Sequence, residues 1–293
     1  MLNFLNGTGV ALVNPFTQSG NLDLNGLENL VEHVIGGGVE YLVVLGTTGE
    51  TATLTPAEKE TVLAKVLEVN KGRLPVVLGI GGNNTAEILL QLEEYELGEI
   101  SAILSVSPYY NKPSQEGIFQ HYKAISEATT KPIIIYNVPG RTASNISPET
   151  TLRIARELPN VVATKEASGS LEQIMQIINH KPAHFMVISG DDNITLPIIA
   201  AGGSGVISVV ANSFPAKFSN MVRASLKGDF QQARKLHYGL LDLMGLHFVE
   251  GNPVGVKAVL HELGVCGSHV RLPLVHASES LKEKIRESVH HHN

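Results

Sequence analysis

The amino-acid sequence predicts a (β/α)8 TIM barrel that is followed by a C-terminal helical extension. Two observations support this fold class: short apolar runs recur eight times along the chain, and segments with helical spacing separate them. Strands that alternate with helices about every 20 to 35 residues indicate βαβ units and a parallel sheet. Eight such units favour a closed barrel, whose functional sites lie at the carboxyl ends of the strands.

The expected strands are short runs rich in Val, Ile and Leu. They span residues 9–13, 41–46, 76–80, 100–106, 132–137, 161–165, 185–189 and 205–210. A doubly wound sheet is the alternative fold, and it would need a nucleotide-binding glycine fingerprint directly after the first strand. Gly7-Thr8-Gly9 is expected to precede that strand instead. The sequence therefore favours the barrel.

The helices between the strands begin at recognisable start signals. In Thr55-Pro56-Ala57-Glu58, Thr55 can cap a helix that holds Pro56 in its first turn. Ser147-Pro148-Glu149 and Thr85-Ala86-Glu87 have the same pattern. Each signal follows an expected strand, so strands and helices alternate as βαβ units require.

The strand pattern stops near residue 224. Helical periodicity then covers residues 229–247, 253–263 and 278–289. We therefore expect two regions, a barrel at 1–224 and a C-terminal helical region at 225–293. The apolar faces of these helices could pack on the barrel or on another subunit, because a helical pattern does not reveal its partner.

Length and composition limit the classes of protein that the chain can represent. Its 293 residues suit one large barrel or two ordinary domains, and 43% hydrophobic with 17% charged residues indicates a full core. A net charge of -6 without a basic block argues against nucleic acid or a membrane surface as partner. The single cysteine and the lack of a signal-peptide pattern favour a cytoplasmic protein. No apolar run approaches the roughly 20 residues of a membrane helix.

Lys165 is the most unusual residue of the expected strands. It lies in the apolar run Val161-Val162-Ala163-Thr164-Lys165-Glu166-Ala167, where a charged ammonium would be costly. Burial disfavours the charged form, and a neutral amine can attack a carbonyl carbon to form a Schiff base. The alternative is a strand-end lysine whose stem is covered while its ammonium group reaches water.

Other polar groups are expected at the same end of the barrel. The turn Gly46-Thr47-Thr48-Gly49-Glu50 offers hydroxyls and backbone N–H groups to a small carboxylate, or is an ordinary glycine-rich turn. Tyr136 can pass protons, and Arg141 can hold a second carboxylate through two hydrogen bonds. Their alternatives are a core tyrosine and a solvated surface charge.

The sequence favours no metal and no cofactor. Asp191 and Asp192 follow the seventh expected strand, but no histidine has ligand spacing to them, and neighbouring residues on a turn point apart. The run His290-His291-His292 is assigned no metal. No Ser-His-Asp or Cys-His arrangement is supported, because Cys266 lies far from any expected strand end.

Four motifs together resemble one family of enzymes. They are Gly46-Thr47-Thr48-Gly49-Glu50, Ser107-Pro108-Tyr109-Tyr110-Asn111-Lys112-Pro113, Tyr136-Asn137-Val138-Pro139-Gly140-Arg141-Thr142 and Lys165-Glu166-Ala167. In this order and spacing, and over nearly the whole chain, they resemble the dihydrodipicolinate synthases, also called 4-hydroxy-tetrahydrodipicolinate synthases. The resemblance implies a lyase on a (β/α)8 barrel, usually a homotetramer built as a dimer of dimers. Its expected reaction condenses pyruvate with L-aspartate 4-semialdehyde on the route to diaminopimelate and lysine.

The resemblance also implies a role for each matching residue. Lys165 would form the imine with pyruvate, and Tyr136 would be the general acid/base. Thr47 would link Tyr136 to Tyr110, which in the family comes from the neighbouring subunit. The substrate-binding residues would be Thr48 for the pyruvate carboxylate, Arg141 for the semialdehyde carboxylate, and Gly190 and Ile207, whose backbone would line the pyruvate pocket.

Three alternative functions share parts of this pattern. N-acetylneuraminate lyases resemble the chain at the Thr-Gly-Glu turn but usually lack a counterpart of Arg141. Aldolases of 2-keto-3-deoxy sugar acids are the nearer alternative. A catalytically inactive barrel that binds keto acids is the third, although binding alone would not require Tyr136, Thr47 and Tyr110 together with Lys165.

The chain differs from many feedback-inhibited members of the family at two positions. Those enzymes bind lysine near the positions of Tyr109, Asn83 and Glu87, which are all present here. Lys59 stands where His or Glu is frequent, and Pro56 replaces another frequent His. An ammonium at position 59 would repel that of the effector, so we expect weak or absent lysine inhibition.

Overall fold

Eight parallel strands close into a barrel in the computed structural model, which describes residues 3–292. The strands are β1 (Gly7–Ala11), β2 (Tyr41–Val44), β3 (Val76–Gly79), β4 (Ala102–Val106), β5 (Ile133–Asn137), β6 (Val161–Glu166), β7 (Met186–Ser189) and β8 (Gly205–Ser208). Each strand pairs with the next in sequence, and β8 pairs with β1. The predicted fold class is confirmed.

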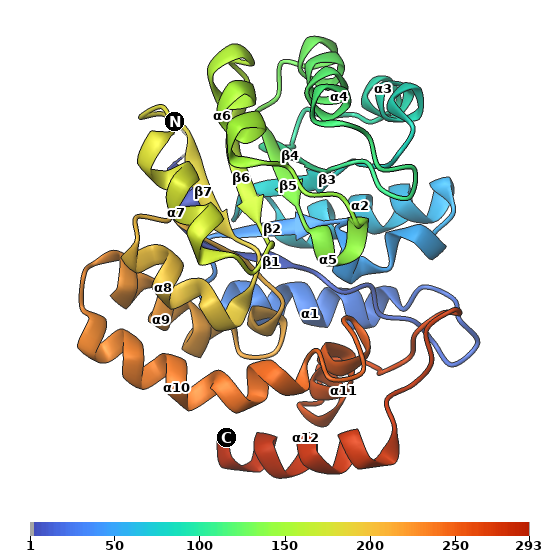
Figure 1. Ribbon diagram of the computed structural model, residues 1–293. Coiled ribbons are helices and arrows are strands. Elements are labelled where there is room, and N and C mark those ends of the chain that lie inside the picture. Colours follow the sequence, from blue (N-terminus) through green and yellow to red (C-terminus); the bar gives the residue numbers. More distant parts are fainter. Residues whose placement is uncertain (1–2, 293) are drawn as a thin grey trace.

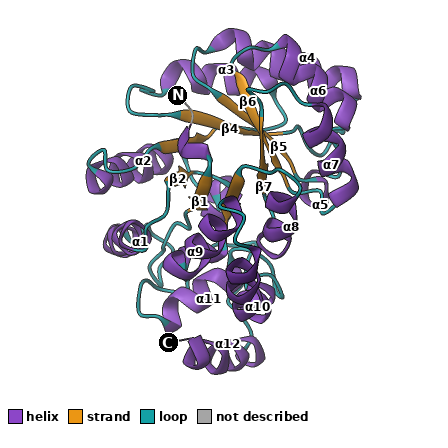
Figure 2. Ribbon diagram, turned by 90° about the vertical axis from the view of Figure 1, so that its left-hand side faces the viewer, coloured by secondary structure: helices purple, strands orange, loops and turns teal. Residues whose placement is uncertain are grey.

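Helices surround the barrel and continue beyond it (Figures 1 and 2). Those between and after the strands are α1 (Leu24–Gly36), α2 (Pro56–Asn70), α3 (Thr85–Glu94), α4 (Gln115–Ala128), α5 (Pro139–Thr142), α6 (Pro148–Glu157), α7 (Leu171–His180), α8 (Thr195–Ala200) and α9 (Pro215–Leu226). The last three are α10 (Phe230–Leu246), α11 (Val254–Glu262) and α12 (Glu279–His292), which lie below the barrel in Figure 1 in orange to red. The expected C-terminal helices are therefore present.

The core has two apolar layers that follow from the alternation of side chains along each strand. One layer lies between the strands and the surrounding helices, and the other fills the inside of the barrel. Ala163 of β6 belongs to the inner layer. Because side chains two residues apart point to the same face of a strand, Lys165 also faces the inside of the barrel.

The first strand begins earlier than the sequence pattern predicts. The expectation of residues 9–13 is wrong by two residues, since β1 starts at Gly7 and ends at Ala11. The neighbouring strand sets this start, because Gly7 pairs with Gly205 of β8. A Cβ on Gly205 would lie 2.1 Å from the carbonyl oxygen of Gly7. The two glycines allow the two backbones to approach this closely, and the pattern of apolar residues does not predict such an approach.

Two of the three expected helix caps are confirmed. Thr55 forms a reciprocal capping box with Glu58 at the start of α2, and Ser147 accepts a hydrogen bond from the backbone of Thr150 at the start of α6. Thr85 is the first residue of α3 rather than its cap. Its hydroxyl lies 2.8 Å from Nδ1 of His121, so this contact with α4 engages the side chain that would otherwise cap the helix.

Packing is continuous between the barrel and the C-terminal helices. Helix α9 contacts both β1 and α10, and the outer apolar layer contains residues of the barrel and of α10, α11 and α12. The division into a barrel at 1–224 and a C-terminal helical region at 225–293 remains a proposal. Within the described residues, no helix has both the length and the apolar character of a membrane-spanning segment.

Candidate active site

A cavity of about 560 Å³ lies at the carboxyl ends of the strands. Six of the eight residues expected at the site line it: Lys165, Tyr136, Thr47, Thr48, Arg141 and Gly190. They come from the ends of β2, β5, β6 and β7, which are separate in sequence and meet at one end of the closed barrel. The structure therefore brings together most of the predicted site.

Lys165 is a buried amine inside this cavity. Its side chain is 6% exposed, and burial lowers the pKa of Lys165 to about 8. The negative charges of Asp191 and Asp192 raise the pKa of Lys165, and the positive charge of Arg141 lowers it further. A lysine with a pKa near 8 is partly neutral at physiological pH, which is the form that attacks a carbonyl carbon.

Tyr136 lies directly beside Lys165. The two residues are paired in register on β5 and β6, and Nζ of Lys165 is 4.2 Å from the centroid of the Tyr136 ring. Burial raises the pKa of Tyr136 to about 12, while Arg141 and a hydrogen bond with the Thr47 side chain lower it in part. At neutral pH the phenol is therefore protonated and can donate to a group bound at Lys165.

The turn after β2 presents Thr48 to the cavity. Its 3-10 helix, η2 (Thr47–Gly49), is followed by Glu50 in a left-handed conformation with φ of 51°. The turn is held by the Thr51 hydroxyl, which donates to the Gly46 carbonyl at 2.8 Å, and by the Asn14 amide, which donates to the Gly49 carbonyl. Thr48 is 3% exposed.

A buried ion pair joins this turn to the C-terminal region. Nζ of Lys257, in α11, lies 2.5 Å from a Glu50 carboxylate oxygen and also donates to the His269 carbonyl at 2.8 Å. Both charged side chains are almost completely buried. The ammonium also lies 4.1 Å from the centroid of the Phe16 ring. Burial lowers the pKa of Lys257, and the Glu50 carboxylate counteracts that effect.

Asn252 is a cavity residue that the sequence analysis missed. It lies between α10 and α11, and its side-chain amide donates to the Thr48 hydroxyl at 2.9 Å. Its main-chain carbonyl accepts a hydrogen bond of 3.3 Å from Arg141. Thr48 and Asn252 are separated by 204 residues, and no local pattern marks Asn252 as a partner of the turn after β2.

The residues after β7 approach Lys165 closely. A Cβ on Gly190 would lie 2.7 Å from Cβ of Ala167 and 3.1 Å from Cε of Lys165, so the site needs glycine there. Asp191 lines the cavity, whereas Asp192 accepts hydrogen bonds from the backbone of Val209 and Val210. Burial raises the pKa of Asp192 to about 6. Among residues 3–292 no group of three His, Cys, Asp or Glu side chains could hold a metal ion.

Two expected site residues do not line the cavity. Ile207 of β8 is fully buried in the inner apolar layer of the barrel. Tyr110 is 87% exposed and has a φ of 72°, in the left-handed region that an aromatic residue rarely adopts. Its side chain points to solvent in a single chain, so the expected link from Tyr136 through Thr47 to Tyr110 requires a second copy.

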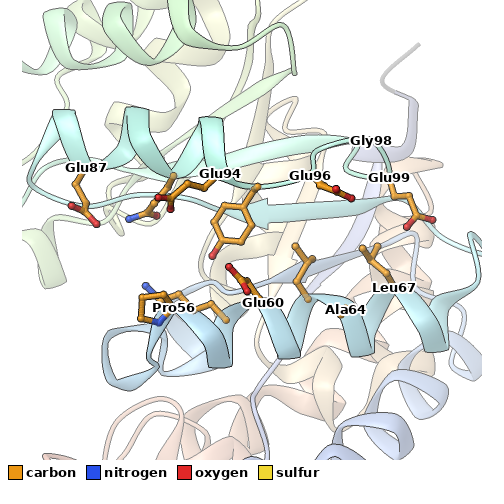
Figure 3. Close-up of a pocket in the computed structure, with 13 residues that line it drawn as sticks. Pro56, Glu60, Ala64, Leu67, Glu87, Glu94, Glu96, Gly98 and Glu99 are labelled. Carbon is orange, nitrogen blue, oxygen red and sulfur yellow. The ribbon is translucent and has the colours of Figure 1, made fainter.

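A second cavity of about 400 Å³ adjoins the first, between α2 and α3 (Figure 3). Lys59, Gln91 and Tyr95 line both cavities. The remaining charged residues of the second cavity are glutamates: Glu60, Glu87, Glu94, Glu96 and Glu99. The two cavities therefore share a boundary at Lys59.

The fold and this site define a class of protein: the lyases built on a (β/α)8 barrel with a buried lysine on the sixth strand. The model of the dihydrodipicolinate synthetase family matches residues 4–292. The chain belongs to that family, and the resemblance seen in its motifs is confirmed.

Known relatives match the chain over nearly its whole length. The 4-hydroxy-tetrahydrodipicolinate synthase of Flavobacterium psychrophilum is 53% identical over 279 residues, which cover 95% of each chain. The chloride-inhibited dihydrodipicolinate synthase of Acinetobacter baumannii, solved with pyruvate, is 39% identical with a TM-score of 0.94 and 98% of both chains covered. The enzyme of Cyanidioschyzon merolae, solved with lysine bound, is 37% identical with a TM-score of 0.93 and 98% and 97% of the two chains covered.

Proposed function

We propose that the chain is a 4-hydroxy-tetrahydrodipicolinate synthase, a lyase that condenses pyruvate with L-aspartate 4-semialdehyde. The observation that carries the proposal is the pairing of Lys165, whose pKa is lowered to about 8, with the protonated Tyr136 inside one cavity. A nucleophilic amine and a proton donor are the two groups that imine chemistry needs. The family relationship and the named relatives support the same reaction.

The reaction begins at Lys165. Its neutral amine attacks the keto carbon of pyruvate, and water leaves as the imine forms, with Tyr136 supplying the proton for the departing oxygen. The protonated imine nitrogen withdraws electrons, so a methyl proton of pyruvate can leave and an enamine results. The enamine carbon then bonds to the aldehyde carbon of the second substrate. Attack of the product's amine on the imine carbon closes a six-membered ring and releases Lys165.

The remaining residues hold the two substrates. Thr48 binds the pyruvate carboxylate through its hydroxyl, and the backbone of Gly190 lines the pyruvate pocket. Arg141 binds the carboxylate of the semialdehyde, since a guanidinium can pair with a carboxylate through two hydrogen bonds. Arg141 is exposed while it lines the cavity, so it can meet a second substrate that arrives from solvent.

We also propose that the enzyme acts as a homotetramer, built as a dimer of dimers. The exposed, left-handed Tyr110 supports this arrangement, because it costs conformational energy and has no role within its own cavity. In the assembly Tyr110 of one subunit would complete the proton relay of its neighbour through Thr47.

The function is tested by trapping the imine. Incubation with pyruvate and cyanoborohydride, followed by peptide mass analysis, should yield a pyruvate-derived adduct on Lys165. At subsaturating pyruvate the initial rate of adduct formation should rise about tenfold per pH unit and level off above pH 8, because the neutral fraction of Lys165 sets it. Absence of an adduct at Lys165 would exclude the imine mechanism. Condensation assays with a panel of aldehydes then distinguish the synthase from the related aldolases.

Lysine is expected to inhibit the enzyme weakly or not at all. Lys59 stands at the boundary of the two cavities and forms no ion pair with any residue that the structure describes, so its charge is free to repel a cationic effector. Steady-state assays should show half-inhibition only above about 1 mM L-lysine, an affinity near the weak end of specific binding. Lys59→His should increase the sensitivity. Sub-millimolar inhibition of the unmodified enzyme would contradict the expectation.

A further inference from the structure

The C-terminal region contributes one polar side chain to the cavity, that of Asn252. The residue is 8% exposed and lines the cavity together with Thr48 and Arg141. Its position between α10 and α11 is outside the barrel strands that supply the reactive groups. Asn252 therefore needs a structural or functional explanation of its own.

Asn252 contacts both groups that hold substrate carboxylates in the proposed function. The side-chain amide donates to the Thr48 hydroxyl at 2.9 Å, and the main-chain carbonyl accepts from Arg141 at 3.3 Å. These contacts come from different atoms, so a change of side chain removes the first and leaves the second. The contribution of the amide to pyruvate binding can thus be separated from the position of Arg141.

The direction of the hydrogen bond to Thr48 has a chemical consequence. A threonine hydroxyl has one proton and can accept through its lone pairs. Because the Asn252 amide donates to this hydroxyl, the proton of Thr48 is left for another acceptor. The only acceptor that the proposed function brings to Thr48 is the pyruvate carboxylate.

The other end of the Asn252 amide carries the energetic cost of this orientation. Its Oδ1 is buried and has no hydrogen-bond partner among the residues that the structure describes. If the amide were reversed, Oδ1 would accept the proton of the Thr48 hydroxyl. That hydroxyl would then have no proton to donate to a carboxylate. The observed orientation leaves an acceptor unsatisfied and keeps Thr48 able to donate.

We propose that Asn252 is a positioning residue for pyruvate, which acts by directing the hydroxyl proton of Thr48 toward the substrate carboxylate. This inference rests on the proposed function. It assigns a specific role in substrate binding to the C-terminal region, which also contacts the turn after β2 through the Glu50–Lys257 ion pair. The role depends on the donor character of the amide rather than on its shape.

Two substitutions separate donor character from shape. Asn252→Ala removes the donor, and the KM for pyruvate should rise about 3- to 12-fold with kcat nearly unchanged, the effect of one lost hydrogen bond. Asn252→Asp keeps the shape but accepts the Thr48 proton and places a negative charge near the substrate carboxylate. Its KM for pyruvate should rise more, by roughly 30- to 100-fold. A purely structural role would reverse this order, because Asp is the closer isostere.

The control is a second buried asparagine that does not contact the cavity. Asn70 is 2% exposed, and its side chain bonds the backbone of Leu74. Asn70→Ala should lower the thermal unfolding temperature and leave the KM for pyruvate unchanged. The same assays with the semialdehyde should show a smaller change for Asn252→Ala than for Arg141→Ala, which removes the proposed aldehyde-binding group.

The outcomes distinguish this inference from the proposed function. The pyruvate concentration that gives half-maximal trapping at Lys165 is measured for the unmodified protein and for each variant. If the unmodified protein gives no adduct, the proposed function fails. If it gives an adduct and both Asn252 variants trap at the same concentration as the unmodified protein, the role of Asn252 is overturned while the function stands. The role is also overturned if Asn252→Asp impairs trapping less than Asn252→Ala.

Discussion

Replacing Tyr136 with phenylalanine is expected to lower kcat by about 100- to 10,000-fold, the usual range for loss of a general acid or base. Burial raises the pKa of Tyr136 to about 12, so the phenol is a proton donor at neutral pH, and phenylalanine has no proton to give. The ring that lies 4.2 Å from Nζ of Lys165 is retained in the variant. Pyruvate capture by Lys165 should therefore persist in part, and steady-state assays combined with imine trapping measure the two effects separately.

A second buried tyrosine provides the control for this experiment. Tyr122 is fully buried, and its hydroxyl donates to the Ser105 carbonyl at 3.0 Å without reaching the cavity. Tyr122→Phe should alter stability and leave kcat close to that of the unmodified enzyme. Equal turnover of Tyr136→Phe and the unmodified enzyme would exclude Tyr136 as the proton carrier.

Replacing Lys257 with methionine is expected to destabilise the protein by about 3 to 5 kcal/mol, the usual effect of removing one partner of a buried ion pair. Glu50 would stay buried without its cation, because its side chain is 2% exposed and the ammonium 2.5 Å away is lost. The backbone N–H of Arg271 would remain its donor at 3.0 Å. Thermal unfolding should report a decrease of roughly 6 to 15 °C in Tm.

Two comparisons test the explanation of this effect. The double variant Lys257→Met/Glu50→Gln removes the uncompensated charge and should regain part of the lost stability, since a neutral amide costs less to bury than a carboxylate. Lys282→Met removes the cation of an exposed pair with Glu279 at 2.7 Å and should change the free energy of unfolding by less than about 1 kcal/mol. Similar losses for Lys257→Met and Lys282→Met would contradict a special role for burial.

The barrel was predictable because its signals are local. Each strand is a short apolar run, and each cap is decided within three or four residues, as at Thr55 and Ser147. The predictions were wrong where a distant partner sets the local structure. Gly7 enters β1 because Gly205 allows two backbones to approach, and the Thr85 hydroxyl contacts His121 on the next helix.

The candidate site was predictable for a related reason. Parallel strands bring their carboxyl ends to one face, so residues at strand ends such as Thr48, Tyr136 and Lys165 meet whatever their separation in sequence. The positions of Asn252 and Lys257 cannot be predicted in this way, because neither residue lies at the end of a barrel strand. They belong to helices and loops after the barrel, and only the tertiary packing of α10 and α11 decides which barrel residues they contact.

The turn after β2 depends on residues that are synthesised much later than the turn itself. Thr48 precedes Asn252 by 204 residues, and Glu50 precedes Lys257 by 207. At roughly 5 to 20 residues per second, about 10 to 40 s of translation separates the two halves of each contact. The eight strands are complete before either contact can form. The contacts that hold this turn therefore form only after the last strand has been synthesised, and a chain shortened before Asn252 would carry Lys165 and Tyr136 but lack both contacts.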